Sequence, residues 1–318
     1  MNCLVTGGAG FIGSHLCEYL LAQGHTVVVI DNFNDFYDPR LKRRNLEPLL
    51  PQRRFTLVEA DILDVEKLHQ VFGKFRFDAV IHLAARAGVR PSIAQPLLYE
   101  QVNVQGTMNL LEMARLYHVP KFIFGSSSSV YGENRKVPFS EDDPVDNPIS
   151  PYAATKKAGE LICYTYHHLY GIKVSCLRFF TVYGQRQRPD MAIHKFTQLI
   201  AMGQKVPMYG DGTTKRDYTF ITDIVDGIYR ALEHCSSYHL YNLGESRTIE
   251  LRTLIELISK NLGKEARIEH LPMQPGDVPI TYAEVTRAQK ELGYQPRVDI
   301  EQGVRLFVEW FKAVHHLR

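Results

Sequence analysis

The sequence predicts a doubly wound α/β fold, and two observations carry this prediction. Short apolar runs rich in β-branched residues alternate with longer segments of helical spacing through the first half of the chain. The short runs are apolar on both faces, which is typical of parallel strands that are covered by helices on two sides. We therefore expect an open parallel sheet between two layers of helices.

The order of the segments along the chain supports this fold. Strands are expected at residues 3–6, 26–30, 55–59, 79–83, 121–124 and 174–177. Helices are expected between them, where apolar residues recur at helical spacing, at residues 11–21, 65–72, 97–117 and 152–170. The alternation of strand and helix indicates parallel strands that are joined by helical crossovers.

The regular alternation ends near residue 180. Beyond it, short strands are expected at 206–209, 218–221 and 239–242, and helices at 194–202, 223–233, 249–262 and 302–314. Proline- and glycine-rich loops separate them. We expect two interleaved domains: residues 1–180, which also receive roughly 222–243, and a smaller C-terminal substrate domain made of 181–221 and 244–318.

Composition and charge limit the classes of function. The chain has 318 residues, of which 45% are hydrophobic and 23% charged, as in a globular protein with a core. Its 37 basic and 35 acidic residues nearly cancel, so charge gives no reason to expect nucleic acid or an anionic membrane as a partner. The longest aliphatic run, residues 27–30, is too short to span a membrane, and we see no secretory signal.

The cysteines and histidines point to no disulfide framework or metal site. The five cysteines are scattered and contain no C-x-x-C pair, and the thirteen histidines lack the spacing of metal ligands. We therefore expect reduced thiols in a cytoplasmic protein, and no bound metal.

A glycine-rich turn lies between the first expected strand and the first expected helix. Glycines stand at positions 7, 10 and 13 in the spacing G-x-x-G-x-x-G. Gly7 permits the tight turn, Gly10 allows the backbone to approach a pyrophosphate, and Gly13 allows the helix to pack closely on the strand. The amides at the helix N-terminus then face the phosphates of a dinucleotide.

Asp31, at the end of the second strand, bears on the choice of dinucleotide. Its carboxylate can accept both hydroxyls of the adenosine ribose and would repel a 2′-phosphate, so the sequence favours NAD over NADP. Basic residues at positions 40 and 42–44 leave NADP as an alternative. We expect these residues to form a solvated basic face of a helix.

Tyr152 and Lys156 stand one turn apart at the start of an expected helix. Residues i and i+4 share one helix face, so the phenol and the ammonium point the same way. A nearby cation lowers the pKa of a phenol and makes the phenolate a usable base near neutral pH. The four serines at 126–129 end the strand before this helix, where ligands of open α/β sheets bind. We interpret Tyr152 as a general base beside these hydroxyls.

Together these motifs resemble those of the extended short-chain dehydrogenases/reductases, and within that group the NAD-dependent nucleotide-sugar epimerases and dehydratases. The resemblance covers essentially the whole chain. It rests on the glycine turn, the serine run, the Tyr152 and Lys156 pair, residues 83–85, and the later segments 209–212, 216–220 and 275–278. The resemblance implies a Rossmann-type sheet that binds NAD, next to a domain that binds a nucleotide sugar.

The resemblance also implies roles for individual residues. The catalytic set would be Ser127, Tyr152 and Lys156. NAD would be bound by Gly7, Gly10, Phe11, Ile12, Asp31, Asn32, Asp61, Ile62, Leu83, Ala84 and Ala85, together with Tyr152 and Lys156. The nucleotide sugar would be bound by Arg86, Ser128, Ser129, Thr181, Arg188, Tyr209, Arg216 and Asp277. In this last set, Tyr209 would pack on the nucleotide base and Arg216 would meet the diphosphate.

Two features indicate which reaction this member catalyses. Dehydratases and decarboxylases of the family usually carry an acidic residue directly after the catalytic serine or threonine, where this chain has Ser128 and Ser129. Segments 84–90, 178–192 and 272–277 are similar to UDP-glucuronate 4-epimerases. The resemblance implies an isomerase that converts UDP-glucuronate to UDP-galacturonate through a 4-keto intermediate, with Arg188 at the sugar carboxylate.

Three alternatives stay open. UDP-glucose 4-epimerases are one, although they typically carry asparagine where this chain has Thr181 and arginine where it has Gln274. A nucleotide-sugar 4,6-dehydratase or decarboxylase is disfavoured by the missing acidic residue, and a pseudo-enzyme that only binds dinucleotide is disfavoured by the intact catalytic set. Relatives commonly pair the helices expected at 97–117 and 152–170, so the resemblance also implies a homodimer.

Overall fold

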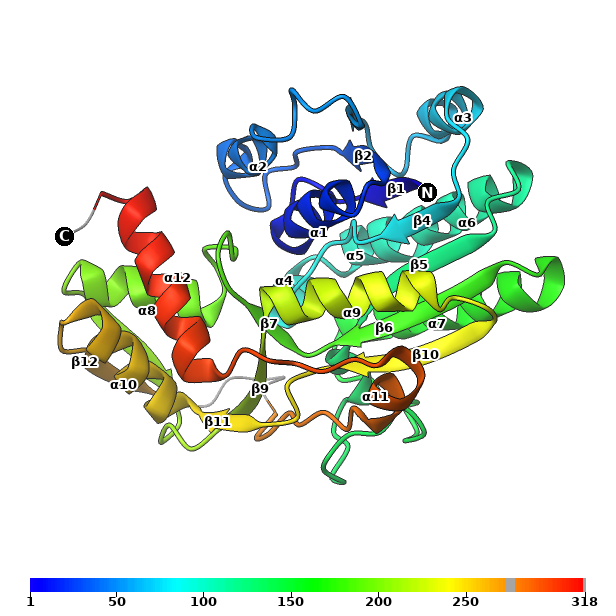
Figure 1. Cartoon of the computed structure of the whole chain (residues 1–318). Helices are drawn as coiled ribbons and strands as arrows, with labels where there is room; N and C mark the ends of the chain where they lie inside the picture. The colour runs from blue at the N-terminus through cyan, green and yellow to red at the C-terminus, as the bar shows by residue number, and fades with distance from the viewer. Residues whose placement is uncertain (273–277, 317–318) are drawn as a thin grey trace.

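A seven-stranded parallel sheet forms the centre of the computed structural model, which describes residues 1–272 and 278–316 (Figure 1). Each strand pairs in parallel with its neighbours. The strand order is β10 (Tyr238–Leu243), β6 (Lys173–Phe179), β5 (Lys121–Ser127), β4 (Ala79–His82), β1 (Asn2–Thr6), β2 (Thr26–Asp31) and β3 (Phe55–Glu59). The doubly wound α/β fold predicted from the sequence is confirmed.

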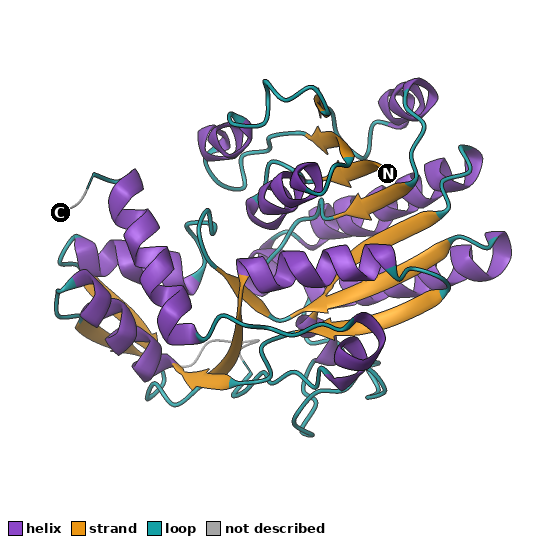
Figure 2. Ribbon diagram, viewed as in Figure 1, coloured by secondary structure: helices purple, strands orange, loops and turns teal. Residues whose placement is uncertain are grey.

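Helices cover both faces of the large sheet (Figure 2). Alternate side chains of the strands enter two separate cores, one on each face. Val5 and Val29 belong to the first core, while Leu4 and Val28, one residue earlier on the same strands, belong to the second. Helices α1 (Phe11–Ala22) and α9 (Ile221–Glu233) cover the first face, and α3 (Val65–Lys74), α6 (Gly106–Leu116) and α7 (Pro151–Tyr170) cover the second. This two-sided burial explains why the strands are apolar throughout.

The strand order reverses direction between β1 and β4. From β1 the chain moves outward through β2 and β3, and it then returns to the other side of β1 and continues through β4, β5, β6 and β10. Open α/β sheets bind their ligands outside the carboxyl ends of the strands at such a reversal. The topology therefore predicts that a ligand binds next to the residues that follow β1, β2, β4 and β5.

The segments that belong neither to the large sheet nor to the helices on its two faces form most of a smaller lobe (Figure 1). Its helices α8 (Ala192–Ala201), α10 (Leu251–Leu262) and α12 (Ile300–Val314) pack on one another. Its strands are β7 (Thr181–Tyr183), β9 (Lys215–Phe220) and β11 (Thr248–Glu250) in one sheet, and β8 (Lys205–Tyr209) with β12 (Arg267–Leu271) in another. Helix α11 (Thr286–Leu292) packs on β10 and α9 instead.

The chain passes between the two parts more than once. The segment that contains α9 and β10 lies late in the sequence, yet β10 pairs with β6 at the edge of the large sheet. The domain boundaries derived from the sequence, 1–180 with 222–243 and 181–221 with 244–318, remain a proposal.

The helix expected at 97–117 is divided in the structure. It consists of α5 (Pro96–Glu100), a π-helical turn at Gln101–Gln105 and α6. The wide turn contains the buried Asn103, whose amide accepts from the backbone N of Arg86 at 2.8 Å and donates to the backbone O of Arg86 at 2.9 Å. This tertiary contact leaves no trace in helical periodicity, so the sequence does not predict the turn.

The helix expected to carry the basic residues 40 and 42–44 is present as α2 (Pro39–Leu46). Several short elements are not predicted from the sequence, among them α4 (Val89–Ala94), β7 and β11, the last two with three residues each. Such segments are too short for a period to be read from them.

Candidate active site

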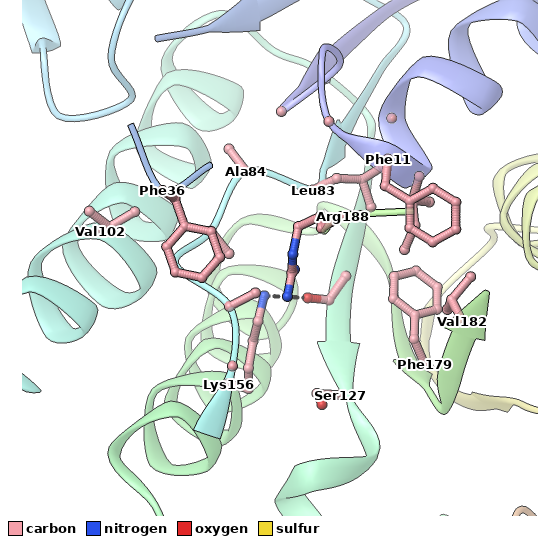
Figure 3. A pocket seen from close by; sticks show the side chains of 18 of the residues that line it. Phe11, Phe36, Leu83, Ala84, Val102, Ser127, Lys156, Phe179, Val182 and Arg188 are labelled. Carbon is pink, nitrogen blue, oxygen red and sulfur yellow. Dashed lines mark hydrogen bonds between the residues drawn. The ribbon is translucent and has the colours of Figure 1, made fainter. Parts of the chain in front are cut away.

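A cavity of about 370 Å³ opens at the carboxyl ends of the central strands (Figure 3). We call it the main cavity. The predicted NAD-binding and catalytic residues all line it: Gly7, Gly10, Phe11, Ile12, Asp31, Asn32, Asp61, Ile62, Leu83, Ala84, Ala85, Ser127, Tyr152 and Lys156. From the predicted sugar-binding set, Ser128, Ser129, Thr181 and Arg188 line it as well.

The glycine turn has the geometry that its spacing predicts. Gly7 adopts a positive φ of 70°, and a Cβ on it would lie 2.7 Å from the backbone N of Ala84. A Cβ on Gly13 would collide with the backbone of Gly7 and Gly8. Gly10 is the N-cap of α1 and offers no side-chain acceptor, and the first turn of this helix has no acidic residue. The amides of the first turn are therefore suited to an anion such as a pyrophosphate.

The carboxylate of Asp31 is held by backbone amides from two segments. Oδ2 accepts from the N of Ala9 at 3.0 Å and Oδ1 accepts from the N of Phe33 at 2.9 Å. Burial raises the pKa of Asp31, whereas these hydrogen bonds and the charge of Lys42 lower it. The carboxylate is thereby fixed where the glycine turn and the end of β2 meet.

Lys42 contradicts the expectation of a solvated basic face. The residue is 5% exposed, lines the main cavity, and donates to the backbone O of Asn34 at 2.8 Å and to its Oδ1 at 3.1 Å. Burial lowers its pKa. Arg40 is exposed as expected. The fold of the 32–38 loop over α2 buries Lys42, and a charge pattern along one helix does not contain that information.

The 32–38 loop also brings two aromatic side chains into the main cavity. Phe36 and Tyr37 both line it, and the ring centroid of Phe36 lies 5.3 Å from the guanidinium carbon of Arg188 and 6.0 Å from that of Arg86. Neither aromatic is predicted from the sequence to line the site. The available signal is three aromatic side chains, at positions 33, 36 and 37, in a short loop that is otherwise Asn and Asp, directly after Asp31.

Tyr152 lies in the first turn of α7. Helix α7 begins at Pro151, and the N-cap Ser150 accepts from the N of Ala153 through Oγ at 3.1 Å. Burial raises the pKa of the Tyr152 phenol, while a hydrogen bond with Ser127 and the positive charge of Arg188 lower it. The structure thus brings Ser127, Tyr152 and Arg188 together from three separate segments.

The ammonium of Lys156 is buried and bonded to the sheet. Its Nζ donates to the carbonyl O of Gly125 in β5 at 2.6 Å, and burial lowers its pKa to about 8. From the sequence we expect Lys156 to lower the pKa of Tyr152, but in the structure burial leaves this pKa raised, and the cation that opposes the rise is Arg188. Arg188 arrives from a distant loop, so helical spacing could not indicate it.

The remaining predicted sugar-binding residues are more dispersed. A second cavity of about 190 Å³ is shared by Ser128, Ser129 and Thr181 and is also lined by Arg216. The ring of Tyr209 lies 4.9 Å from the guanidinium carbon of Arg90. Among the described residues, Arg86 and Tyr209 are not part of the lining of either cavity. Asp277 lies outside the described residues.

The 185–190 loop carries Arg188 into the main cavity, with Phe36 on one side and Phe179 on the other (Figure 3). Arg188 donates from Nε to Oδ1 of Asp190 at 3.0 Å and from Nη2 to Oδ2 at 2.9 Å. The loop is tied to α1, because Arg186 pairs with Glu18 at 2.5 Å and the backbone O of Gln185 lies 2.9 Å from His15 Nε2. The helix of the glycine turn and the loop of Arg188 are therefore joined directly.

His82 lies in β4, beneath the cavity, and both of its ring nitrogens are hydrogen-bonded. Nδ1 lies 2.7 Å from Thr6 Oγ1 and Nε2 lies 3.0 Å from Thr107 Oγ1, and burial lowers the pKa of His82 to about 3. In the part of the chain that the structure describes, no group of three or more His, Cys, Asp or Glu side chains is arranged to hold a metal ion. Across the same residues, no helix has the length and apolar character needed to cross a membrane.

The fold and the main cavity define a class of protein. A glycine turn after β1, an acidic residue at the end of β2 and a Ser-Tyr-Lys group at β5 and α7 are the features of a nucleotide-binding protein of the short-chain dehydrogenase/reductase type. The chain belongs to the GDP-mannose 4,6 dehydratase family within the NAD-dependent epimerase/dehydratase group, and the sequence model of this family matches residues 4–307.

Individual relatives are similar over nearly the whole chain. A UDP-glucuronate 4-epimerase of Thermodesulfobacterium geofontis is 43% identical over 310 residues, which are 97% of this chain and 95% of that protein. The crystal structure of a UDP-glucuronic acid 4-epimerase from Bacillus cereus, in complex with UDP-glucuronic acid and NAD, matches with a TM-score of 0.92 at 38% identity and covers 99% of this chain and 100% of that one. A UDP-glucose 4-epimerase of Thermotoga maritima, solved with UDP-glucose, also matches with a TM-score of 0.92, at 35% identity and the same coverage.

Proposed function

We propose that this chain is an NAD-dependent 4-epimerase of UDP-sugars, an isomerase, and that it converts UDP-glucuronate to UDP-galacturonate through a 4-keto intermediate. The observation that carries the proposal is the position of Arg188. It lies in the same cavity as Tyr152, and near enough for its charge to lower the pKa of the phenol. A cation beside the general base offers a partner to a carboxylate on the reacting sugar.

The relatives support this proposal at two levels. The epimerase class and the use of NAD, both expected from the sequence, are confirmed by the family and by relatives solved with NAD. Glucuronate is favoured by the 43% identity to a UDP-glucuronate 4-epimerase. The match to a UDP-glucose 4-epimerase at the same TM-score keeps UDP-glucose as the second candidate.

The main cavity fits NAD. In this proposal the pyrophosphate lies at the uncapped N-terminus of α1, near Gly10, Phe11 and Ile12. Asp31 and Asn32 hold the adenosine ribose, and Asp61 with Ile62 flanks the adenine. When bound, NAD supplies the site with a group that accepts hydride from the sugar C4 and returns it.

Tyr152 moves the proton in the proposed reaction. Its phenolate takes the proton from the sugar O4, and Ser127 holds O4 by a hydrogen bond. Because burial raises the pKa of Tyr152, the phenolate depends on the opposing hydrogen bond and charge that the site provides. Lys156 would orient Tyr152 and hold a ribose hydroxyl of the dinucleotide. The same phenol returns the proton after the 4-keto sugar has turned over.

The carboxylate of glucuronate poses a problem that the cavity must solve. The 4-keto form is a β-keto acid, and it loses carbon dioxide when the bond to the carboxylate aligns with the carbonyl π-system. Fixing the carboxylate out of alignment prevents this loss. Arg188 is our candidate for that restraint, with Ser128, Ser129 and Thr181 as hydroxyl donors around the same part of the cavity.

Elimination of water fits the described cavity less well. A 4,6-dehydratase needs an additional acid near the sugar, directly after Ser127, where the chain has Ser128. The acidic side chains among the described lining residues of the main cavity are Asp31, which ends β2, and Asp61, which follows β3. Both belong to the part of the cavity that we assign to the adenosine. Epimerisation requires no such acid.

The remaining substrate contacts follow the resemblance. Tyr209 would pack on the uracil, Arg216 would bind the diphosphate, and Arg86 and Asp277 would complete the nucleotide-sugar site. Arg216 lines the second cavity together with Ser128 and Thr181, which supports a path from the sugar to the diphosphate.

Product analysis tests the function directly. The purified protein is incubated separately with UDP-glucuronate and with UDP-glucose, and the sugars are identified by NMR. The proposal requires galacturonate from the first substrate at a higher kcat/KM than galactose from the second. Exclusive turnover of UDP-glucose, or release of a 4-keto-6-deoxy sugar, would replace it with one of the alternatives.

We also propose a homodimer in the cytoplasm. Helices α6 and α7 pack side by side and carry exposed apolar residues such as Met108, Leu161 and Tyr164. Pairing with a second copy would cover these side chains. Light scattering at micromolar concentration tests this: a monomer would exclude the pairing.

A further inference from the structure

Arg188 has a partner within its own loop, Asp190. Its guanidinium uses Nε and Nη2 to make two nearly equal hydrogen bonds, of 3.0 Å and 2.9 Å, to the two carboxylate oxygens of Asp190. The Arg188 side chain is 20% exposed and that of Asp190 is 47% exposed. Burial raises the pKa of Asp190, but the hydrogen bonds from Arg188 lower it overall, so the carboxylate is ionised near neutral pH.

This pairing occupies one of the two edges with which a guanidinium can bind a carboxylate. Arginine has five N–H donors in a planar fork. Asp190 takes the side edge, formed by Nε and Nη2, and the end edge, formed by Nη1 and Nη2, has the geometry for a second carboxylate. Because the side edge is nearer to the backbone, it suits a residue two positions away, whereas the end edge is at the tip of the side chain in the cavity (Figure 3).

The surroundings restrict the guanidinium further. The ring of Phe36 lies 5.3 Å from the guanidinium carbon. The backbone O of Arg188 accepts from the N of Met191 at 3.1 Å, which closes the turn that brings Asp190 back to Arg188. The preceding residue, Gln187, is 2% exposed and donates from Nε2 to the backbone O of Val182 at 3.1 Å. The loop is therefore a rigid support for one orientation of Arg188.

We propose that Asp190 is a positioning residue that sets the substrate selectivity of this site. By holding the side edge of Arg188, it presents the end edge to a single carboxylate, that of the sugar, beside Tyr152. The inference rests on the proposed function, because it assigns a role toward the carboxylate of glucuronate. Preorganisation of this kind improves binding because the arginine does not have to be ordered when the substrate arrives.

The same restraint controls a side reaction. In the 4-keto intermediate the C5–C6 bond can break, its electron pair forms the enolate of the ketone, carbon dioxide leaves, and C5 then takes a proton. The released 4-keto pentose retains the oxidation introduced at C4, so reduced dinucleotide remains on the enzyme. A mobile Arg188 lets the carboxylate sample the aligned geometry, and Asp190 therefore protects the intermediate.

The test compares Asp190→Ala and Asp190→Asn with the wild type on both UDP-glucuronate and UDP-glucose. We expect Asp190→Ala to raise the KM for UDP-glucuronate about tenfold and to increase the ratio of pentose to epimer. Asp190→Asn retains one acceptor oxygen and should have an intermediate effect. UDP-glucose is the reference substrate, because a displaced Arg188 would change the Tyr152 phenol for both sugars equally. The ratio of kcat/KM for UDP-glucuronate to that for UDP-glucose should therefore fall about tenfold in Asp190→Ala.

Two controls separate positioning from folding. Asp142 forms a similar exposed ion pair with Arg287, at 2.7 Å, away from the lining of both cavities, so Asp142→Ala should leave every readout unchanged. In an Arg188→Ala background, Asp190→Ala should add no further effect on UDP-glucuronate, because Asp190 acts through Arg188.

The outcomes distinguish this inference from the proposed function. A lower KM for UDP-glucuronate in Asp190→Ala would show that Asp190 competes with the substrate and would overturn the positioning role. Three other results would also overturn it: an effect of Asp190→Ala that persists in the Arg188→Ala background, equal losses on both sugars, or no effect at all. In each of these cases the wild type still epimerises UDP-glucuronate. If the wild type does not turn over UDP-glucuronate, both the function and the role of Asp190 are wrong.

Discussion

Lys156 and Gly125 join α7 to the end of β5 through a hydrogen bond of 2.6 Å between the ammonium and the carbonyl oxygen. Gly125 lies two residues before Ser127, and Lys156 lies one turn after Tyr152. The bond therefore holds α7, which carries the proposed base Tyr152, against β5, which carries the hydroxyl of Ser127. In this arrangement Lys156 supports the position of Tyr152, while the charge of Arg188 opposes the rise that burial causes in the pKa of the phenol.

Tyr152→Phe should abolish turnover while the protein still binds the dinucleotide. The substitution removes the phenol oxygen that takes the proton and keeps the ring, which packs edge-to-face near Tyr99 at 6.2 Å between centroids. General-base catalysis contributes about 10²- to 10⁴-fold, so kcat should fall by that factor. The measurement is epimer formation per enzyme, with dinucleotide content determined on the same sample. Activity within about threefold of the wild type would mean that another group is the base.

Asp31→Ala should weaken NAD binding and reduce the discrimination against NADP. The carboxylate that would accept the ribose hydroxyls, and repel a 2′-phosphate, is then missing. Loss of its bonds to Ala9 and Phe33 also loosens the turn, so both dinucleotides should bind less tightly, NAD more so. Titration calorimetry with each dinucleotide measures the ratio, and the exposed Asp35 provides the control variant Asp35→Ala. An unchanged NAD-to-NADP ratio would show that the ribose is held elsewhere.

The buried His82 should make stability depend on pH. Thr6 Oγ1 accepts from Ala84, and Thr107 Oγ1 donates to the backbone O of Asn103, so the ring accepts at Nδ1 and donates at Nε2 and is neutral. Burial lowers its pKa to about 3 from an ordinary value of 6.5. Between these values the unfolded chain binds one more proton than the folded chain. The contribution of His82 to stability is therefore complete above pH 6.5 and is lost as the pH falls toward 3.

The variant His82→Gln isolates this contribution. From about pH 7 to about pH 5, the free energy of unfolding of the wild type should fall by on the order of 2 kcal/mol more than that of the variant. Urea unfolding at the two pH values gives the difference. Asp217, whose pKa burial raises to about 6, has the opposite sign, but it is present in both proteins and cancels. Parallel pH profiles would mean that His82 is not buried as a neutral ring in solution.

The sequence predicts those parts of the site that depend on local order. Each of these parts is a pattern within a few consecutive residues: the glycine spacing, Asp31 at the end of a strand, and the i, i+4 pair of Tyr152 and Lys156. The parallel topology then brings the ends of distant strands together without further information. For this reason all the predicted NAD-binding residues line one cavity.

The parts that the sequence does not predict depend on contacts between loops. Phe36 and Lys42 enter the cavity because the 32–38 loop folds back over it, and Asp190 meets Arg188 through a turn whose geometry no spacing rule describes. The buried Asn103 in the π-helical turn is a further example, since its partner is the backbone of a different segment. These contacts determine how the site is held, whereas the motifs determine which residues compose it.

Ser128→Asp should separate the two candidate sugars. Ser128 lines both cavities, directly after Ser127, and is partly exposed to them. An aspartate there introduces a negative charge close to the proposed position of the glucuronate carboxylate, and like charges at such a contact cost several kcal/mol. The KM for UDP-glucuronate should therefore rise by at least about tenfold, while UDP-glucose, which is neutral at C6, should be affected much less.

Ser128→Asn is the matched control, because asparagine has nearly the shape of aspartate without the charge. If the charge is responsible, Ser128→Asn should keep the proposed preference for UDP-glucuronate. The preference of Ser128→Asp should recover partly at high salt, which screens exposed charges. Steady-state kinetics with both sugars, at two ionic strengths, provide the comparison. Equal losses on both sugars in the two variants would mean that position 128 only tolerates a small side chain. The proposed preference for glucuronate would then depend on Arg188 alone. If Arg188→Ala also left the ratio of kcat/KM for the two sugars unchanged, UDP-glucose would become the better candidate.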